Sequence, residues 1–144
     1  MIKRALLLIL LVSAIFSSNK TWAQHELKVT IKNYDNEEGS FMVAIFSAKE
    51  DFLKRDYISK KVKVEPGQST SVYFENIPSG YYAVSIFHDE NENGKLDKNF
   101  VGIPKEDFGF SNNARARFGP PDFDEAKVMV AADTSLEVEM RGIL

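Results

Sequence analysis

The chain has no cysteine. This excludes a disulfide, a catalytic thiolate and a cysteine-ligated zinc, and it leaves no cysteine to carry the lipid of a lipoprotein. Motifs of other chemistries are also absent: there is no Gly-x-Ser-x-Gly elbow, no His-Glu-x-x-His pair and no phosphate-binding glycine loop. After residue 23 no stretch shows helical periodicity of useful length. Stability must therefore come from burial of apolar strands, with or without a bound ion.

The amino terminus has the pattern of an export signal. Lys3 and Arg4 precede an apolar run, Ala5 to Phe16, that is short for a membrane span. Ala23 offers a small residue before a cleavage point. We therefore predict that residues 1–23 are a signal peptide, as opposed to an uncleaved anchor, and that residues 24–144 form one domain of a periplasmic or secreted protein.

The mature chain is acidic. Cleavage after Ala23 removes three of the 18 basic residues, so 15 basic residues face 21 acidic ones and the formal charge becomes −6. An acid excess of this kind disfavours nucleic acids and anionic lipid surfaces as partners.

Short apolar segments with a period of two recur along the mature chain, separated by turn residues. This pattern predicts an all-β fold, a single antiparallel immunoglobulin-like or transthyretin-like β-sandwich of about seven strands with one long irregular loop. The first two strands, joined by a short turn, are expected to form a hairpin. Either Tyr81 or Tyr82 is expected to bond back to the chain at a corner, and Phe52 and Leu53 to attach a short helical turn to the core. The strands are expected at 26–32, 41–46, 57–64, 69–75, 82–88, 127–131 and 136–140.

A strand ending at His88 leads directly into an acidic loop. Asp89, Asn91, Asn93 and Asp97 occupy positions 1, 3, 5 and 9 of a calcium-loop pattern, and Gly94 is at position 6, where the backbone must turn. The carbonyl oxygen of Lys95 would be the ligand at position 7. The five ligand residues, Asp89, Asn91, Asn93, Lys95 and Asp97, predict a Ca²⁺ site.

The pattern is incomplete at position 12, where Phe100 replaces the usual glutamate, so Glu106, Asp107 or water would have to supply the missing oxygens. The alternative is that Asp, Asn and Gly gather here because they favour turns, and that Glu90 and Glu92 are solvated charges. His88 is expected to be a hydrogen-bonded histidine at the edge of the core, because calcium prefers oxygen and no second histidine is near.

A glycine- and proline-rich segment, residues 100–124, follows the acidic loop. Its length without regular structure suggests a functional loop, and its four phenylalanines after position 107 are expected to pack over one end of the sandwich. Asn112, Asn113, Arg115 and Arg117 could bind a carboxylate or sugar hydroxyls. We favour a structural interpretation, in which the two arginines pair with Asp89, Asp97 or Asp107 and hold the loop closed, because the chain is acidic and these partners are close in sequence.

The stretch IPSGYYAVSIFHDENENGKLDKNFVGIPKEDFGFSNNARARFGPPDF resembles the family of small exported bacterial proteins called domain of unknown function 2141. The resemblance extends less sharply through the flanking strands. It implies an exported β-sandwich domain without established activity, so no catalytic residue is carried over.

These observations predict a non-enzymatic module of the cell envelope that binds Ca²⁺ and presents residues 100–124 to a protein or glycan partner. One alternative is a polysaccharide-directed hydrolase that uses paired carboxylates such as Asp97 and Asp107. The other is a purely structural envelope component without metal.

Overall fold

The computed structural model describes residues 23–34, 36–67, 69–115 and 117–142, so most of the predicted signal peptide lies outside the described residues. The described residues form eight strands and three short helical segments. They are β1 (Gln24–Lys32), β2 (Ser40–Phe46), η2 (Lys49–Asp51), β3 (Ile58–Lys63), β4 (Ser69–Pro78), β5 (Gly80–Asp89), β6 (Phe108–Phe110), η3 (Ser111–Asn113), α2 (Phe123–Ala126), β7 (Val128–Val130) and β8 (Thr134–Glu139).

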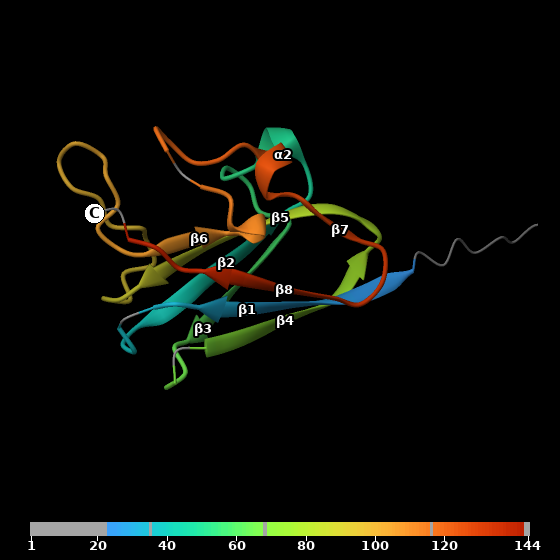
Figure 1. Cartoon of the computed structure of the whole chain (residues 1–144), viewed down its shortest axis with the longest axis horizontal. Helices are drawn as coiled ribbons and strands as arrows, with labels where there is room; N and C mark the ends of the chain where they lie inside the picture. Colours follow the sequence, from blue (N-terminus) through green and yellow to red (C-terminus); the bar gives the residue numbers. More distant parts are fainter. Residues whose placement is uncertain (1–22, 35, 68, 116, 143–144) are drawn as a thin grey trace, which may run out of the picture.

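The fold is all-β and contains two sheets (Figure 1). A three-stranded sheet has the order β4-β1-β8, and a five-stranded sheet has the order β3-β2-β5-β6, with β7 paired to the start of β5. The sequence led us to expect antiparallel pairing throughout. This is wrong for one pair, because β8 runs parallel to β1. The chain reaches β8 only after the β6 to β7 segment, and this long crossover lets β8 run in the same direction as β1.

The core lies between the two sheets. Alternate residues of β1 (Leu27, Val29, Ile31) and of β2 (Phe41, Val43, Ile45) are buried in one cluster with residues of β4, β5 and β8. Burial of each such side chain contributes about 1.5–3 kcal/mol. The period of two in the sequence therefore predicted correctly which residues face inward.

The predicted hairpin of the first two strands is wrong. β1 pairs with β4 and β8, whereas β2 pairs with β3 and β5. The connection between them crosses from one sheet to the other, and Tyr34 within it is buried, with its hydroxyl donating to the carbonyl of Glu65 at 2.9 Å. Two strands with an alternating pattern bury the same side chains whether they pair or face each other across a core, so the pattern could not distinguish the two arrangements.

The outer face of the five-stranded sheet carries a second apolar cluster. Phe46 of β2 and Ala83 of β5 pack there with Phe52, Phe110 and Phe123. Phe123 begins α2, and Figure 1 shows α2 beside β5. Part of the predicted irregular loop is thus a covering layer of the sheet.

Three expectations for side chains meet different outcomes. The Tyr82 hydroxyl donates to the Pro78 carbonyl at 2.9 Å, which confirms the predicted tie, whereas Tyr81 is exposed. Phe52 packs as predicted, but Leu53 is 38% exposed and belongs to neither buried cluster. Of the four phenylalanines expected to pack over the sandwich, Phe118 does not, because its side chain is fully exposed.

Within the described residues, no helix is long and apolar enough to cross a membrane.

Gly109→Ala tests how closely β6 packs on the other sheet. A Cβ atom at Gly109 would lie 2.7 Å from Val138 Cγ1 and 2.8 Å from the Glu139 carbonyl oxygen. We expect the free energy of unfolding to fall by about 1–3 kcal/mol in urea denaturation, because the two sheets must move apart. Gly119→Ala is the control, since a Cβ there meets nothing within 4 Å, and its change should stay within about 0.5 kcal/mol. Equal stability of the two variants would contradict this packing.

Candidate functional site

The candidate site begins where β5 ends. Tyr82, Val84, Ile86 and His88 alternate along the inward face of this strand and are buried. His88 is fully buried against Phe41, and a 2.7 Å hydrogen bond joins its Nε2 to the Glu38 carbonyl oxygen. This confirms the prediction of a hydrogen-bonded core histidine.

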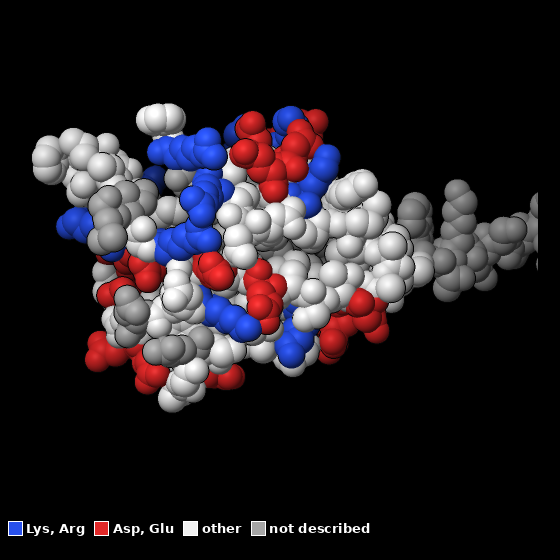
Figure 2. All heavy atoms as spheres, in the orientation of Figure 1, with Lys and Arg blue, Asp and Glu red and all other residues white. Residues whose placement is uncertain are grey.

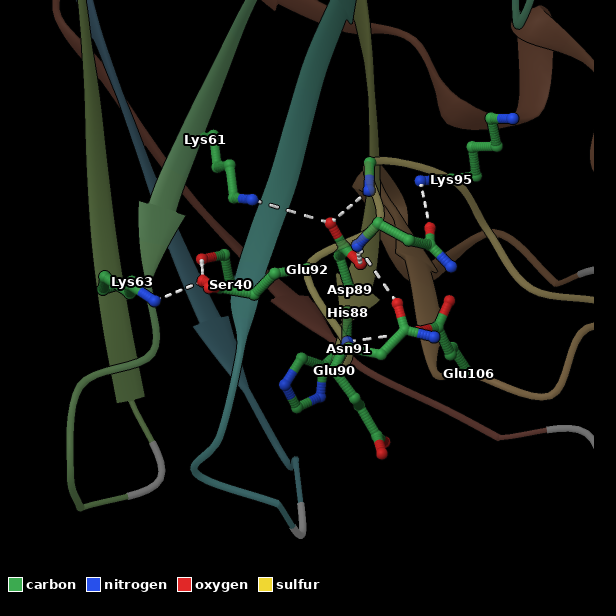
Figure 3. A network of polar contacts seen from close by, with 12 residues as sticks. Ser40, Lys61, Lys63, His88, Asp89, Glu90, Asn91, Glu92, Lys95 and Glu106 are labelled. Carbon is green, nitrogen blue, oxygen red and sulfur yellow. Dashed lines mark hydrogen bonds and ion pairs between the residues drawn. The ribbon is translucent and has the colours of Figure 1, made fainter.

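Asp89 is the residue on which the acidic loop closes. Its side chain is 0% exposed, and its two carboxylate oxygens accept hydrogen bonds from the backbone N–H groups of Asn93 and Gly94, each at 2.9 Å. Lys61 of β3 forms an ion pair with the same carboxylate at 3.7 Å (Figure 3). A buried carboxylate with these partners fixes the turn, because its oxygens would otherwise be left without hydrogen bonds.

The other predicted ligand side chains meet in the same turn. The side-chain amide of Asn91 donates to Asp97 Oδ2 at 2.6 Å, and that of Asn93 donates to both Asp97 oxygens at 3.1 Å. The side-chain Oδ1 of Asn91 accepts the backbone N–H of Asn93 at 3.1 Å, and the side-chain Oδ1 of Asn93 accepts that of Lys95 at 2.8 Å. The structure therefore brings together Asp89, Asn91, Asn93 and Asp97, and ties Lys95 to them through its backbone.

Glu106 completes the loop from a distant position in the sequence. Its buried carboxylate accepts the backbone N–H of Glu90 at 3.1 Å and that of Asp97 at 2.9 Å. Glu106 was one of two acidic residues expected to compensate for Phe100, whose side chain is fully exposed. The other, Asp107, accepts the backbone N–H of His88 through its carbonyl oxygen at 2.8 Å.

Glu92 attaches the loop to the five-stranded sheet. Its Oε1 accepts the Ser40 hydroxyl at 2.9 Å and pairs with the Lys63 ammonium group. The hydrogen bond from Lys63, followed by that from Ser40, holds the pKa of Glu92 below its ordinary value. From the sequence, Glu92 was named only in the alternative without calcium, as a solvated charge, so this role was missed. It depends on two strands that lie beside the loop only in the folded chain.

Gly39 lets the turn before β2 approach the acidic loop. Its φ is +76°, and a Cβ atom there would lie 2.3 Å from the Asp89 carbonyl oxygen. Only glycine fits this position.

The four residues predicted to bind a ligand in the long segment separate into two pairs. The Asn112 amide donates to the Lys127 carbonyl at 2.8 Å, and Asn113 Oδ1 accepts the Glu139 N–H at 3.0 Å, so both amides hold the fold together. Arg115 and Arg117 are exposed. Neither forms an ion pair with another described residue, so the favoured prediction, that they pair with Asp89, Asp97 or Asp107 and hold the loop closed, is not borne out.

The donors gathered here are mainly oxygens of carboxylates, amides and the backbone. Among the described residues no three His, Asp or Glu side chains gather as a metal-binding group. A cation in this loop would therefore also require the amide oxygens of Asn91 and Asn93 and the Lys95 carbonyl oxygen.

The protein is thus an all-β protein of two sheets with an acidic, asparagine-rich loop at the end of its central strand. Residues 29–138 match the family described as an uncharacterized protein conserved in bacteria, DUF2141. The chain belongs to this family, as the resemblance in its loop region indicated. No curated protein and no solved structure matches the chain.

Asp89→Asn tests whether this carboxylate closes the loop. The amide that replaces it has one carbonyl oxygen and no charge, so it cannot accept both backbone N–H groups and pair with Lys61. In calcium-free buffer with a chelator we expect a loss of about 1–3 kcal/mol in the free energy of unfolding. Glu90→Gln is the matched control, because Glu90 is exposed and its carboxylate has no hydrogen bond to a described residue. If both variants unfold at the same urea concentration, Asp89 does not have this role.

The lowered pKa of Glu92 predicts that the free energy of unfolding depends on pH in the acid range. Because the folded-state pKa lies below the ordinary value of 4.5, Glu92 contributes stability that is present above pH 4.5 and is lost as the pH falls through the lowered pKa. Glu92→Gln should be less stable than the original chain at neutral pH, and the two should converge once the pH has fallen below the lowered pKa of Glu92. Urea midpoints measured across this range check the prediction, and a constant difference between the two chains would refute it.

Proposed function

We propose that the mature protein is an exported, non-enzymatic module that binds Ca²⁺ in the Asp89–Asp97 loop. Its sandwich is of the immunoglobulin-like or transthyretin-like type, and it presents the 100–124 segment to a protein or glycan partner in the periplasm or outside the cell. Export rests on the signal pattern of residues 1–23. The sandwich type is supported by the bond from Tyr82 to Pro78, which resembles the tyrosine corner of such domains.

The observation that carries the calcium proposal is the meeting of Asp89, Asn91, Asn93 and Asp97 in one hydrogen-bonded turn. Hard cations such as Ca²⁺ take six to eight oxygen ligands from carboxylates, amides and backbone carbonyls. An amide oxygen that accepts one N–H keeps a second lone pair. The five predicted ligand positions therefore lie within one turn, and a bound calcium would take its remaining ligands from Glu106 or water.

The charges in the loop also favour a cation. Asp89 and Glu106 hold different backbone N–H groups of the same loop: Asp89 accepts that of Gly94, and Glu106 accepts that of Asp97, whose own carboxylate adds a third negative charge. Lys61 offsets part of this charge at 3.7 Å from Asp89, while Asp97 accepts amide N–H groups in the place where a cation could bind. Extracellular modules with loops of this type bind calcium with dissociation constants on the order of 10⁻⁴ to 10⁻³ M.

The proposal of a partner rests on exposed apolar side chains in the 100–124 segment. Phe100 and Phe118 are fully exposed, and Val101 and Ile103 are partly exposed. Several exposed large apolar side chains within one segment favour an interaction surface.

Calcium should stabilise the protein against heat. At 10 mM calcium, about ten to a hundred times dissociation constants of 10⁻³ to 10⁻⁴ M, a ligand that binds only the folded state adds roughly 1.4 to 2.7 kcal/mol. We expect differential scanning calorimetry of chelator-treated protein to show a rise in Tm as millimolar calcium is added.

The Tm of an Asp97→Ala variant should respond little to calcium, whereas Glu90→Gln, outside the predicted ligand set, should respond like the original chain. Magnesium should be less effective, because it requires near-octahedral geometry. A Tm that calcium does not change would remove the ion from the proposed function.

A further inference from the structure

A cavity of about 630 Å³ lies over the outer face of the five-stranded sheet. Its floor follows from strand register. Met42 pairs with Phe87 and Phe87 with Phe108, and in the next row Ala44 pairs with Ser85 and Ser85 with Phe110. Directly opposed residues point to the same side of a sheet, so these two rows form a mainly apolar floor.

The cavity continues the surface that the second apolar cluster covers. The neighbouring row, Phe46 and Ala83, is buried beneath Phe52 and Phe123. Above the two rows of the floor, which contain Ser85 and Phe87, other segments of the chain form walls, and the space between these walls is open. Leu96 to Pro104 contributes one wall and Arg117 to Pro120 another. The volume is in the range of small-molecule sites, which are commonly apolar with a few polar groups.

Charged side chains at the cavity are mostly cations. Lys54, Lys98 and Arg117 line it, against one carboxylate, Asp56. Lys54 donates to the Glu50 carbonyl at 3.3 Å, and neither Lys98 nor Arg117 has an ion pair with another described residue. Figure 2 shows Lys and Arg side chains gathered over the segment between η3 and α2. In a chain of net charge −3, this excess of cations is local.

From the apolar floor and the cationic rim, we infer that the cavity binds a small organic carboxylate with an apolar body. The body lies on Phe87 and Phe108, where it is removed from water. The carboxylate lies at Lys98 and Arg117, and the arginine can hold it with two parallel hydrogen bonds. The site is separate from the Asp89 carboxylate and does not require the proposed calcium.

The probes are 2-naphthoate and its neutral isostere 2-naphthamide, titrated by isothermal calorimetry into the full mature chain, both with chelator and with calcium. We expect 2-naphthoate to bind at least about tenfold more tightly than 2-naphthamide. A double variant, Lys98→Gln with Arg117→Gln, should remove this preference. Ala44→Trp, which fills the floor, should abolish binding of both probes.

Arg115→Gln is the matched control, because Arg115 is exposed on the same segment but does not line the cavity. It should bind 2-naphthoate as the original chain does, and thermal melts should show that each variant is folded. Absence of 2-naphthoate binding in both buffers, or equal affinity for the two probes, would overturn the inference. Either result would leave the calcium proposal intact, since that is measured by the shift in Tm.

Discussion

The alternation of β5 determines both sides of the larger sheet. Its even-numbered residues from Tyr82 to His88 enter the core, and its odd-numbered residues Ala83, Ser85 and Phe87 face outward, toward the second apolar cluster and the cavity. A shift of one residue would exchange these two sets. Because the strand is held in register by β2 over seven residue pairs, the position of Asp89 at its end is held too.

The acidic loop is built into the sheet and does not simply extend from it. Asp89 is buried and bonded to the turn that follows it, Glu92 is bonded to residues of β2 and β3, and Glu106 returns from beyond the loop to hold two of its backbone N–H groups. Such contacts restrict the loop before any ligand is bound. A site restricted in this way loses less conformational entropy on binding than a loose one.

The sequence predicted what depends on local pattern. Seven of the eight strands were expected near their observed places, and the spacing of Asp89, Asn91, Asn93 and Asp97 indicated that they share one turn. β6 was missed because three residues within a glycine-rich segment carry too little alternation. The parallel pairing of β8 and the attachment of Glu92 to Lys63 depend on contacts between distant segments, which alternation does not encode.

The acidic loop and the cavity share one piece of chain. Asp97 belongs to the loop, the next residue, Lys98, lines the cavity, and Lys98 pairs with Pro104 in an isolated β-bridge. The backbone N–H of Lys105 also donates to the Asp97 carbonyl at 2.8 Å, so Asp97 is bonded to the residue that follows the wall ending at Pro104. If a cation and an organic anion each favour the same position of this wall, each must raise the affinity of the other by the same factor. The proposed calcium would then act on the cavity by fixing the position of Lys98, without contacting the anion.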